Sequence, residues 1–150
     1  MKLEEAKKIA EEVFGELTEQ CDKVIVVGSI RRKCAEVHDI DIVVIPKKPN
    51  LFDGHGRIFS GGKKIIKFER SGIQVEIYVA DEKTYEVLKL IRTGSKEHNI
   101  KLCRIARNQG YMLKADGTGL CWLDGKVIDN TEAGILNKLL GRYVEPEGRK

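Results

Sequence analysis

Hydrophobic positions follow a helical period at the start of the chain and a strand-like pattern soon after it. In the first 17 residues, seven apolar side chains recur at helical spacing, which predicts an amphipathic helix over about residues 2–17. Two β-branched runs follow, at residues 23–27 and 39–45, and they end at a glycine and a proline. Runs of this length that are rich in valine and isoleucine are typical of buried strands, so we expect two strands here.

The middle of the chain predicts a long loop and then a hairpin. Residues 47–62 contain one proline and four glycines and keep no period, which is the composition of a surface loop. Residues 63–70 and 73–79 are again strand-like, and Ser71-Gly72 between them supplies a tight turn. We therefore expect a β-hairpin, which brings the sheet to four strands.

The second half of the chain predicts helices and short strands. Helices are expected over about residues 82–92 and 96–109, with Gly94 taking a left-handed conformation at the end of the first and Ser95 capping the second. Short strands and a last helix follow, at about residues 111–114, 121–123 and 126–128 and then, after a Thr131 cap, up to about residue 140.

Fold class and domain organisation follow from this order of elements. The predicted class is α+β: a mixed β-sheet flanked by helices over residues 1–92, and a small α/β subdomain over residues 93–150. A chain of 150 residues with 41% hydrophobic side chains can form one domain, or two small subdomains that share a core. The 27 lysines and arginines exceed the 23 acidic residues, a net charge of +4 that is compatible with a polyanionic partner but does not identify one.

Composition argues against several classes of protein. The four cysteines form no C-x-x-C pair, so neither a disulfide framework nor a zinc ribbon is expected. No apolar run approaches the roughly 18 residues of a membrane span, and the first segment is charged and amphipathic rather than a signal peptide. We expect reduced thiols, a cytoplasmic location and no contact with a membrane.

The strand at residues 39–45 begins with two acidic residues that indicate metal chemistry. Side chains alternate between the faces of a strand, so Asp39 and Asp41 should project together while Ile40 and Ile42 enter the core. Two like charges at one point are unfavourable unless a cation lies between them, and hard oxygen ligands suit Mg²⁺, or Mn²⁺ in its place. Such carboxylate pairs serve phosphoryl and nucleotidyl transfer.

A third carboxylate and a phosphate cradle complete the candidate site. Glu76, on the second hairpin strand, is the best candidate for the third carboxylate, and Glu69 and Asp81 are weaker candidates. Gly28 lets backbone amides approach a phosphate, Ser29 adds a hydroxyl donor, and Arg32 can fork onto phosphate oxygens. A turn beside a solvated charge cluster would explain each feature alone, but their combination on adjacent strands favours a functional site.

At this point the sequence resembles the nucleotidyltransferase superfamily, and more closely the family X DNA polymerases. The family pattern Gly-Ser-x-Arg-Arg is matched at residues 28–32, and Asp-x-Asp at residues 39–41. Thr-Gly-Ser-x-x-x-Asn is matched at residues 93–99, and Tyr-x-x-Pro-x-x-Arg at residues 143–149. The resemblance therefore covers about residues 20–149, with four motifs in the family's order.

The resemblance implies a nucleotidyltransferase palm at residues 1–92 and a thumb at residues 93–150. It implies a metal-dependent DNA-directed DNA polymerase that adds nucleotides to a primer 3′-hydroxyl in short-gap repair. Its expected partners are a nucleoside triphosphate and primer-template or gapped DNA, with the chain acting as a monomer. The implied residues are Asp39, Asp41 and Glu76 for the two metal ions, Gly28, Ser29 and Arg32 for the triphosphate, Thr93, Gly94 and Ser95 for the sugar, and Asn99 for the base edge.

The chain also departs from the family pattern. The family usually has aspartate where Glu76 stands, and animal members carry an aromatic pair where this chain has Ile91-Arg92, which leaves deoxy-over-ribo selectivity open. The lyase and helix-hairpin-helix domains of the family have no counterpart in this sequence, so a basic surface would have to hold the DNA. The expected donors are Lys96, Lys101, Arg104 and Arg107 on the helix at residues 96–109.

Three alternatives stay open. The basic side chains of that helix could be a solvated face beside core residues Ile100, Cys103 and Ala106. The chain could be an untemplated nucleotidyltransferase acting on RNA, protein or small molecules, although the motifs at residues 28–32 and 93–99 argue against it. It could also be a non-catalytic nucleotide- or DNA-binding module, which the glutamate at position 76 would suit.

Overall fold

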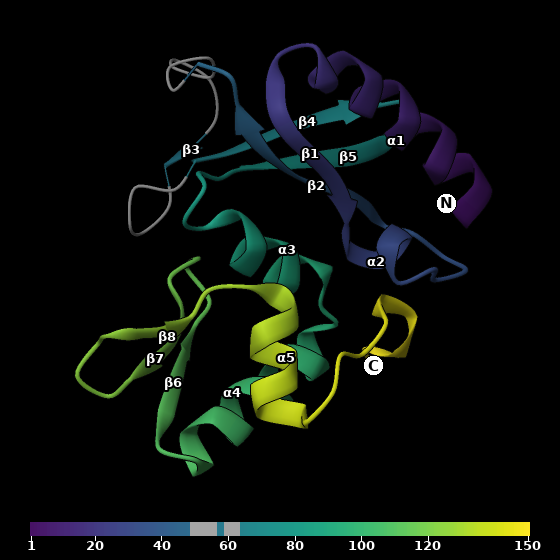
Figure 1. The fold of residues 1–150 in the computed structure, drawn as a ribbon. Coiled ribbons are helices and arrows are strands. Elements are labelled where there is room, and N and C mark those ends of the chain that lie inside the picture. Colours follow the sequence, from purple (N-terminus) through teal and green to yellow (C-terminus); the bar gives the residue numbers. More distant parts are fainter. Residues whose placement is uncertain (49–56, 59–63) are drawn as a thin grey trace.

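The computed structural model describes residues 1–48, 57–58 and 64–150, so most of the loop predicted at residues 47–62 lies outside the described residues. The chain forms two parts, each built on one β-sheet (Figure 1). Across the larger sheet the order is β1 (Cys21–Val27), β2 (Asp39–Pro46), β5 (Ile73–Val79), β4 (Lys64–Arg70) and β3 (Arg57–Ile58). The smaller sheet holds β6 (Tyr111–Lys114), β7 (Gly119–Trp122) and β8 (Val127–Asp129).

Five α-helices and a short 3₁₀ helix accompany the sheets within the described ranges. They are α1 (Leu3–Thr18), α2 (Gly28–Arg31), α3 (Tyr85–Thr93), α4 (Lys96–Asn108), α5 (Glu132–Leu140) and the 3₁₀ helix at Pro146–Gly148. None of the helices in those ranges is both long and apolar enough to cross a membrane. β2 runs parallel to β5 and antiparallel to β1, so the predicted α+β class with a mixed sheet is confirmed.

Two sequence predictions about these elements were wrong. The larger sheet has a fifth strand, β3, inside the region predicted as loop; two residues are too few to show a period in the sequence. The helix predicted from residue 82 begins at Tyr85, because Asp81 first turns the chain. The Asp81 carboxylate accepts the backbone N–H groups of Lys83 at 2.9 Å and Thr84 at 3.0 Å, and these bonds stabilise the turn at residues 82–84 that precedes the helix.

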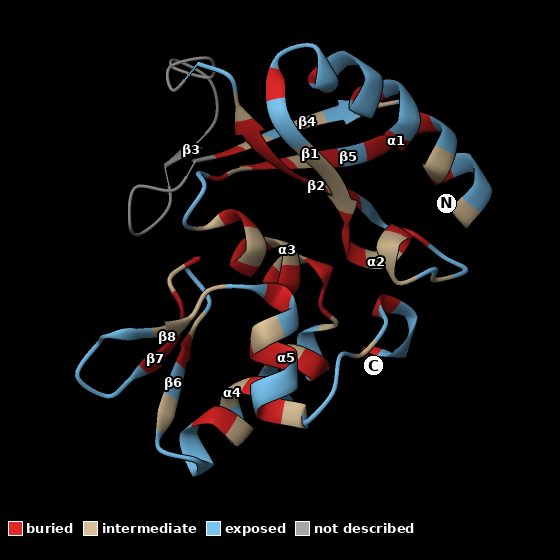
Figure 2. Cartoon of the chain, in the orientation of Figure 1, coloured by how far each residue is buried: buried red, intermediate tan, exposed pale blue. Residues whose placement is uncertain are grey.

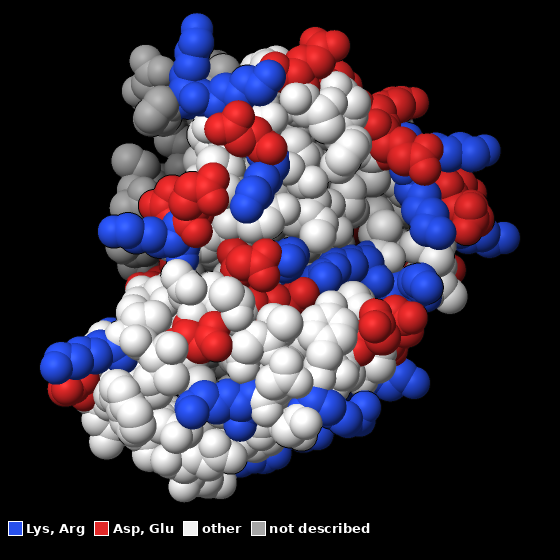
Figure 3. All heavy atoms as spheres, viewed as in Figure 1, with Lys and Arg blue, Asp and Glu red and all other residues white. Residues whose placement is uncertain are grey.

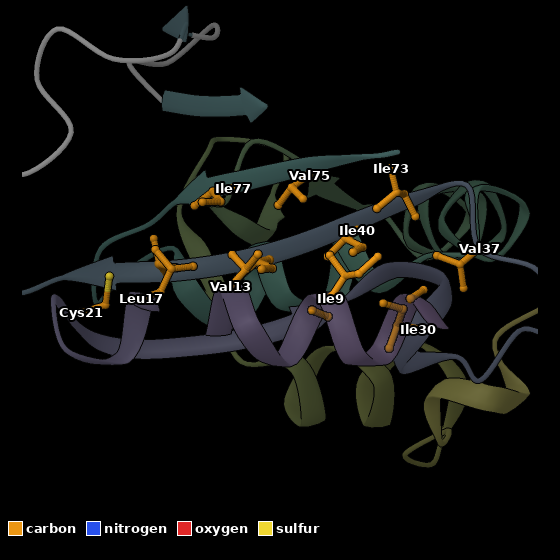
Figure 4. Close-up of a cluster of buried hydrophobic side chains, with 14 residues drawn as sticks. Ile9, Val13, Leu17, Cys21, Ile30, Val37, Ile40, Ile73, Val75 and Ile77 are labelled. Carbon is orange, nitrogen blue, oxygen red and sulfur yellow. The ribbon is translucent and has the colours of Figure 1, made fainter. Parts of the chain in front are cut away.

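Strand alternation gives the larger sheet two different faces. One face is apolar along its length and lies under α1, where Ile9 and Val13 of the helix contact Ile40, Val75 and Ile77 of the strands (Figure 4). The other face is apolar at only one end, where side chains from β1, β2, β4 and β5 pack against α3. The polar end of this second face is where the acidic side chains of β2 and β5 project.

The smaller part has its own core between its sheet and helices α3, α4 and α5 (Figure 2). Leu90 and Leu102 are fully buried in it, as is Ala106, which was predicted as core. Ile100 was also predicted as core, and this was wrong: it is 55% exposed, because it lies on the outer side of α4 among the basic residues. The boundary predicted between residues 92 and 93 stays a prediction, since α3 packs into the cores of both parts.

A buried ion cluster joins the two parts. Glu132, the first residue of α5, is only 2% exposed, and its carboxylate accepts two hydrogen bonds from Arg31 of α2, at 2.6 and 2.9 Å. It also accepts one from Arg149 at 2.9 Å and one from the Tyr143 hydroxyl at 3.3 Å. Arg31 donates in addition to Thr93 Oγ1 at 2.8 Å. Acidic and basic side chains gather along the junction of the two parts in Figure 3.

Candidate active site

Two neighbouring strands bring two carboxylates side by side. β2 and β5 are parallel and in register, with Asp41 opposite Glu76. Ile40 and Ile42 point to the other face and are fully buried, as the alternation predicts. Asp39 lies on the same face as Asp41, one strand repeat earlier, and is exposed. The pairing of β2 with β5 therefore sets the distance between Asp41 and Glu76.

The pKa of Asp41 reflects this crowding. Burial raises the pKa of Asp41, the charge and hydrogen bond of Glu76 raise it further, and Asp39 adds a smaller increase. Arg92 opposes the rise, and the result is a pKa of about 7 instead of the ordinary 3.8. A cation placed between the acids would remove the repulsion that raises this pKa.

The acids fit a hard cation chemically, but they are not preassembled around one. Within residues 1–48, 57–58 and 64–150, no three His, Cys, Asp or Glu side chains are already grouped as a metal site. Asp41 and Glu76 share a hydrogen bond, and Asp39 points into the same pocket from the exposed end of β2. Three mutually repelling carboxylates have no reason to converge before a cation binds, so the predicted ligand set Asp39, Asp41 and Glu76 stays a prediction.

The start of α2, directly after β1, places backbone against the acids. Gly28 has φ of +65°, and a Cβ there would collide with the Asp41 carboxylate, so only glycine fits the close approach. Ser29 follows at the start of α2 and lines the same pocket. Arg32 follows α2, and its Nε is buried without a hydrogen-bond partner in the described part of the chain. The predicted triphosphate residues thus lie next to the predicted metal residues.

The turn between α3 and α4 forms the opposite wall. Gly94 has the expected positive φ, 71°, but its ψ of −149° lies outside the predicted left-handed helical conformation. The Thr93 hydroxyl donates to Lys89 O at 2.6 Å and accepts from Arg31, while Ser95 Oγ accepts the His98 N–H at 3.1 Å as the predicted cap of α4. Both hydroxyls therefore make hydrogen bonds within the protein, and sugar binding by this turn stays a prediction.

Asn99 and the predicted DNA-binding residues extend from this wall along α4. The Asn99 amide donates to Ile91 O at 2.8 Å, and its Oδ1 is buried without a partner among the described residues. Lys96, Lys101, Arg104 and Arg107 are all exposed, and the described residues offer none of them an ion pair within 4.0 Å. With Ile100 exposed among them, α4 presents an outer face that is basic rather than merely amphipathic.

The residues predicted to bind metal or nucleotide line one pocket. A cavity of about 460 Å³ is lined by all ten residues assigned from sequence to metal or nucleotide: Gly28, Ser29, Arg32, Asp39, Asp41, Glu76, Thr93, Gly94, Ser95 and Asn99. Of the four predicted DNA-binding residues, Lys96 alone reaches it. The volume lies in the range of roughly 300–1,000 Å³ that small-molecule ligands occupy in proteins.

Sequence reasoning missed Gln74 and Tyr78 at this pocket, and it missed the contact that Arg92 makes there. Gln74 and Tyr78 both hydrogen-bond to Glu76, and Arg92 covers the Tyr78 ring with its guanidinium 4.4 Å from the ring centre. A signal for the first two was present, because residues two positions before and after Glu76 share its face of the strand. Nothing in the sequence pointed to Arg92 over Tyr78, because that contact requires α3 to lie across the sheet.

Comparisons with known proteins bear on the second half of the chain and on the fold. Residues 88–150 match the family model of the DNA polymerase beta thumb. Among solved structures, the fold is similar to Leishmania infantum polymerase beta in a ternary P/T complex, with a TM-score of 0.73 and 17% sequence identity over 100% of this chain and 76% of that chain. At this identity the likeness concerns the fold. Curated protein sequences include no significant match.

Proposed function

We propose that the chain is a family X DNA polymerase-like protein, and that it acts as a metal-dependent DNA polymerase that extends a primer 3′-hydroxyl; the match of residues 88–150 to the DNA polymerase beta thumb supports this. The observation that carries the proposal is the single pocket in which the β2 and β5 acids face the Gly28 segment and the turn before α4. Short-gap repair synthesis is the reaction we assign to it. Its substrates would be a nucleoside triphosphate and primer-template or gapped DNA.

The reaction would join the 3′-hydroxyl oxygen of the primer to the α-phosphorus of the nucleotide. The bond from that phosphorus to the bridging oxygen breaks, and pyrophosphate leaves with the bond's electron pair. Glu76 lies beside Asp41 and is the group best placed to take the hydroxyl proton. Arg32 lies where it can bind the triphosphate, with an unpartnered Nε and a guanidinium beside Gly94.

Mg²⁺, or Mn²⁺ in its place, would supply charge neutralisation for the triphosphate and the attacking oxygen. Asp39, Asp41 and Glu76 are the residues that would hold it, and their all-oxygen donor set suits these ions. The raised pKa of Asp41 supports this assignment, because a site with excess negative charge is what a cation relieves. We further infer a cytoplasmic location, which the four free cysteines favour, and a chain that acts as a monomer.

The proposal is tested by nucleotide incorporation with the purified chain. The substrates are a one-nucleotide gap, a recessed primer and a single strand, each with Mg²⁺ or Mn²⁺ and with deoxy- or ribonucleotides. Template-matched addition is expected at the gap and the recessed primer. Addition without regard to template would instead support an untemplated transferase, and nucleotide binding without turnover would support a non-catalytic module.

DNA contact through α4 makes a separate prediction. The Leishmania infantum protein is described in a ternary P/T complex, and the exposed Lys96, Lys101, Arg104 and Arg107 are the donors we propose for backbone phosphates here. Arg104→Ala should weaken DNA binding about equally for all sequences and lower the slope of log affinity against log salt by about one. Fluorescence anisotropy at several salt concentrations measures both.

The matched control is Lys8→Ala, which removes one exposed positive charge from α1, on the far side of the larger sheet. This variant should keep the parental slope. Equal slopes for Arg104→Ala and the parent chain would contradict the proposed DNA contact. The basic side chains of α4 would then be only a solvated helix face.

A further inference from the structure

The Glu76 carboxylate is held by side chains of its own strand. The Tyr78 hydroxyl donates to Glu76 Oε2 at 2.6 Å, and Gln74 Nε2 donates to Oε1 at 3.1 Å. Lys67 of the neighbouring β4 adds a charge 3.6 Å from Oε1. Residues 74, 76 and 78 share one face because strand side chains alternate. Both oxygens of the carboxylate are therefore occupied from the side of β5 and β4, while the carboxylate also reaches Asp41 of β2.

Tyr78 is the firmest of these partners. The residue is 6% exposed and lies in the apolar cluster between the larger sheet and α3, and the Arg92 guanidinium lies 4.4 Å from the ring centre. The hydroxyl projects from this cluster to the edge of the pocket, where Glu76 begins the polar end of the same face. Gln74, in contrast, is exposed, and Lys67 has a 44% exposed side chain. Packing in this cluster and the Arg92 contact thus fix where the hydroxyl lies.

Resting on the function proposed above, we propose that Tyr78 is a positioning residue that holds the Glu76 carboxylate against Asp41, with Arg92 fixing the Tyr78 ring. Glutamate has one more rotatable bond than aspartate, so its carboxylate loses more freedom when it is placed at a reacting centre. A rigid donor two residues along the strand supplies the missing constraint. The contact with Tyr78 explains how the longer glutamate side chain is held in place at position 76. A shorter aspartate there would need no such contact.

A purely structural role for Tyr78 makes a different prediction from a positioning role. Tyr78→Phe keeps the buried ring and the Arg92 stacking and removes only the hydroxyl. If Tyr78 only fills the cluster, this variant should be as active as the parent. If it positions Glu76, kcat should fall by about 10- to 100-fold, as for loss of an outer partner of a site residue, while KM for the nucleotide stays within about twofold.

The same substitution in a Glu76→Asp background separates the two roles further. The aspartate carboxylate is one methylene shorter and cannot reach the Tyr78 hydroxyl, so adding Tyr78→Phe to Glu76→Asp should change kcat by less than about twofold. Tyr85→Phe is the matched control: Tyr85 is buried in the same cluster, contacts no predicted site residue through its hydroxyl in the described structure, and should keep parental kcat. Equal losses in both backgrounds, or none in the first, would overturn the proposal.

A crystal structure of Tyr78→Phe without metal or nucleotide tests the contact without any activity. We expect the Glu76 carboxylate to leave its position beside Asp41, and an unchanged Glu76 rotamer would overturn the positioning role. If the unaltered chain incorporates no nucleotide, the proposed polymerase function fails. The Glu76 rotamer in this variant still decides whether Tyr78 positions it.

Discussion

Replacing Asp41 by asparagine should abolish nucleotide incorporation and, at the same time, make the metal-free protein more stable at pH 8. Asparagine keeps the shape of the side chain and removes its charge. Several kcal/mol of transition-state stabilisation depend on a metal-binding carboxylate, so turnover should fall at least about a thousandfold. A residue with a structural role would lose stability and function together. A loss of turnover together with a gain in stability would show that Asp41 serves the reaction rather than the stability of the fold.

The expected gain in stability follows from the raised pKa of Asp41. The folded chain keeps the Asp41 proton up to a pKa of about 7, whereas the unfolded chain loses it near 3.8. Between these values the folded state binds more protons than the unfolded state, so stability falls as pH rises, and above about 7 the full penalty is present. Asparagine carries no such penalty and should stabilise the metal-free chain at pH 8 by roughly 2–4 kcal/mol.

Thermal unfolding at pH 5 and pH 8 in a chelating buffer measures this effect. The Tm advantage of Asp41→Asn over the parent should be larger at pH 8 than at pH 5, and added Mg²⁺ should reduce it by stabilising only the parent. Asp22→Asn, at an exposed carboxylate of β1, is the control and should show no such pH trend. An advantage that is the same at both pH values would contradict the assignment of a buried, repelled carboxylate at Asp41.

Replacing Glu132 by alanine should destabilise the fold by about 3–5 kcal/mol. The substitution leaves Arg149 without a counter-ion although its side chain is fully buried, and it removes both hydrogen bonds between Arg31 and α5. An unpaired buried charge is the reason for the large effect. For a chain of this size the shift in Tm should be on the order of 10 °C.

The control for Glu132→Ala is Glu82→Ala. Glu82 pairs with Lys23 at 3.6 Å on the surface, with its side chain 72% exposed, so its loss should change stability by less than about 1 kcal/mol. Urea unfolding followed by circular dichroism measures both variants. Similar small changes in the two variants would show that the junction cluster does not hold the two parts together.

The pH dependence of the parent chain adds a check on the same cluster. Burial raises the pKa of Glu132, but hydrogen bonds and charge from Arg31 and Arg149 outweigh burial and hold that pKa below the ordinary 4.5. As pH falls, Glu132 therefore binds its proton at a higher pH in the unfolded chain than in the folded chain. The contribution of Glu132 is therefore present above about pH 4.5 and is lost as pH falls through its folded pKa, so Glu132→Gln should flatten the acid limb of the stability profile.

The candidate site could be predicted from the sequence to the extent that it depends on local periods. Alternation along one strand is enough to place Asp39 and Asp41 on one face and Ile40 in the core, and the motifs at residues 28–32 and 93–99 could be located by their spacing. All of the residues assigned in this way to metal or nucleotide line one pocket. The prediction was wrong for Ile100, because one apolar residue on a basic helix face does not reveal which side of the helix is packed.

The sequence by itself therefore determined the class of the fold and the order of most of its elements, and it predicted which residues line the pocket, since each of these rests on a pattern a few residues long. Only the tertiary structure decided that β2 lies beside β5, and with it that Asp41 faces Glu76 and that Arg92 covers Tyr78. It also decided that Arg31 meets Glu132, 101 positions away. Contacts of this kind depend on how packed elements cross in space, and no local period encodes that.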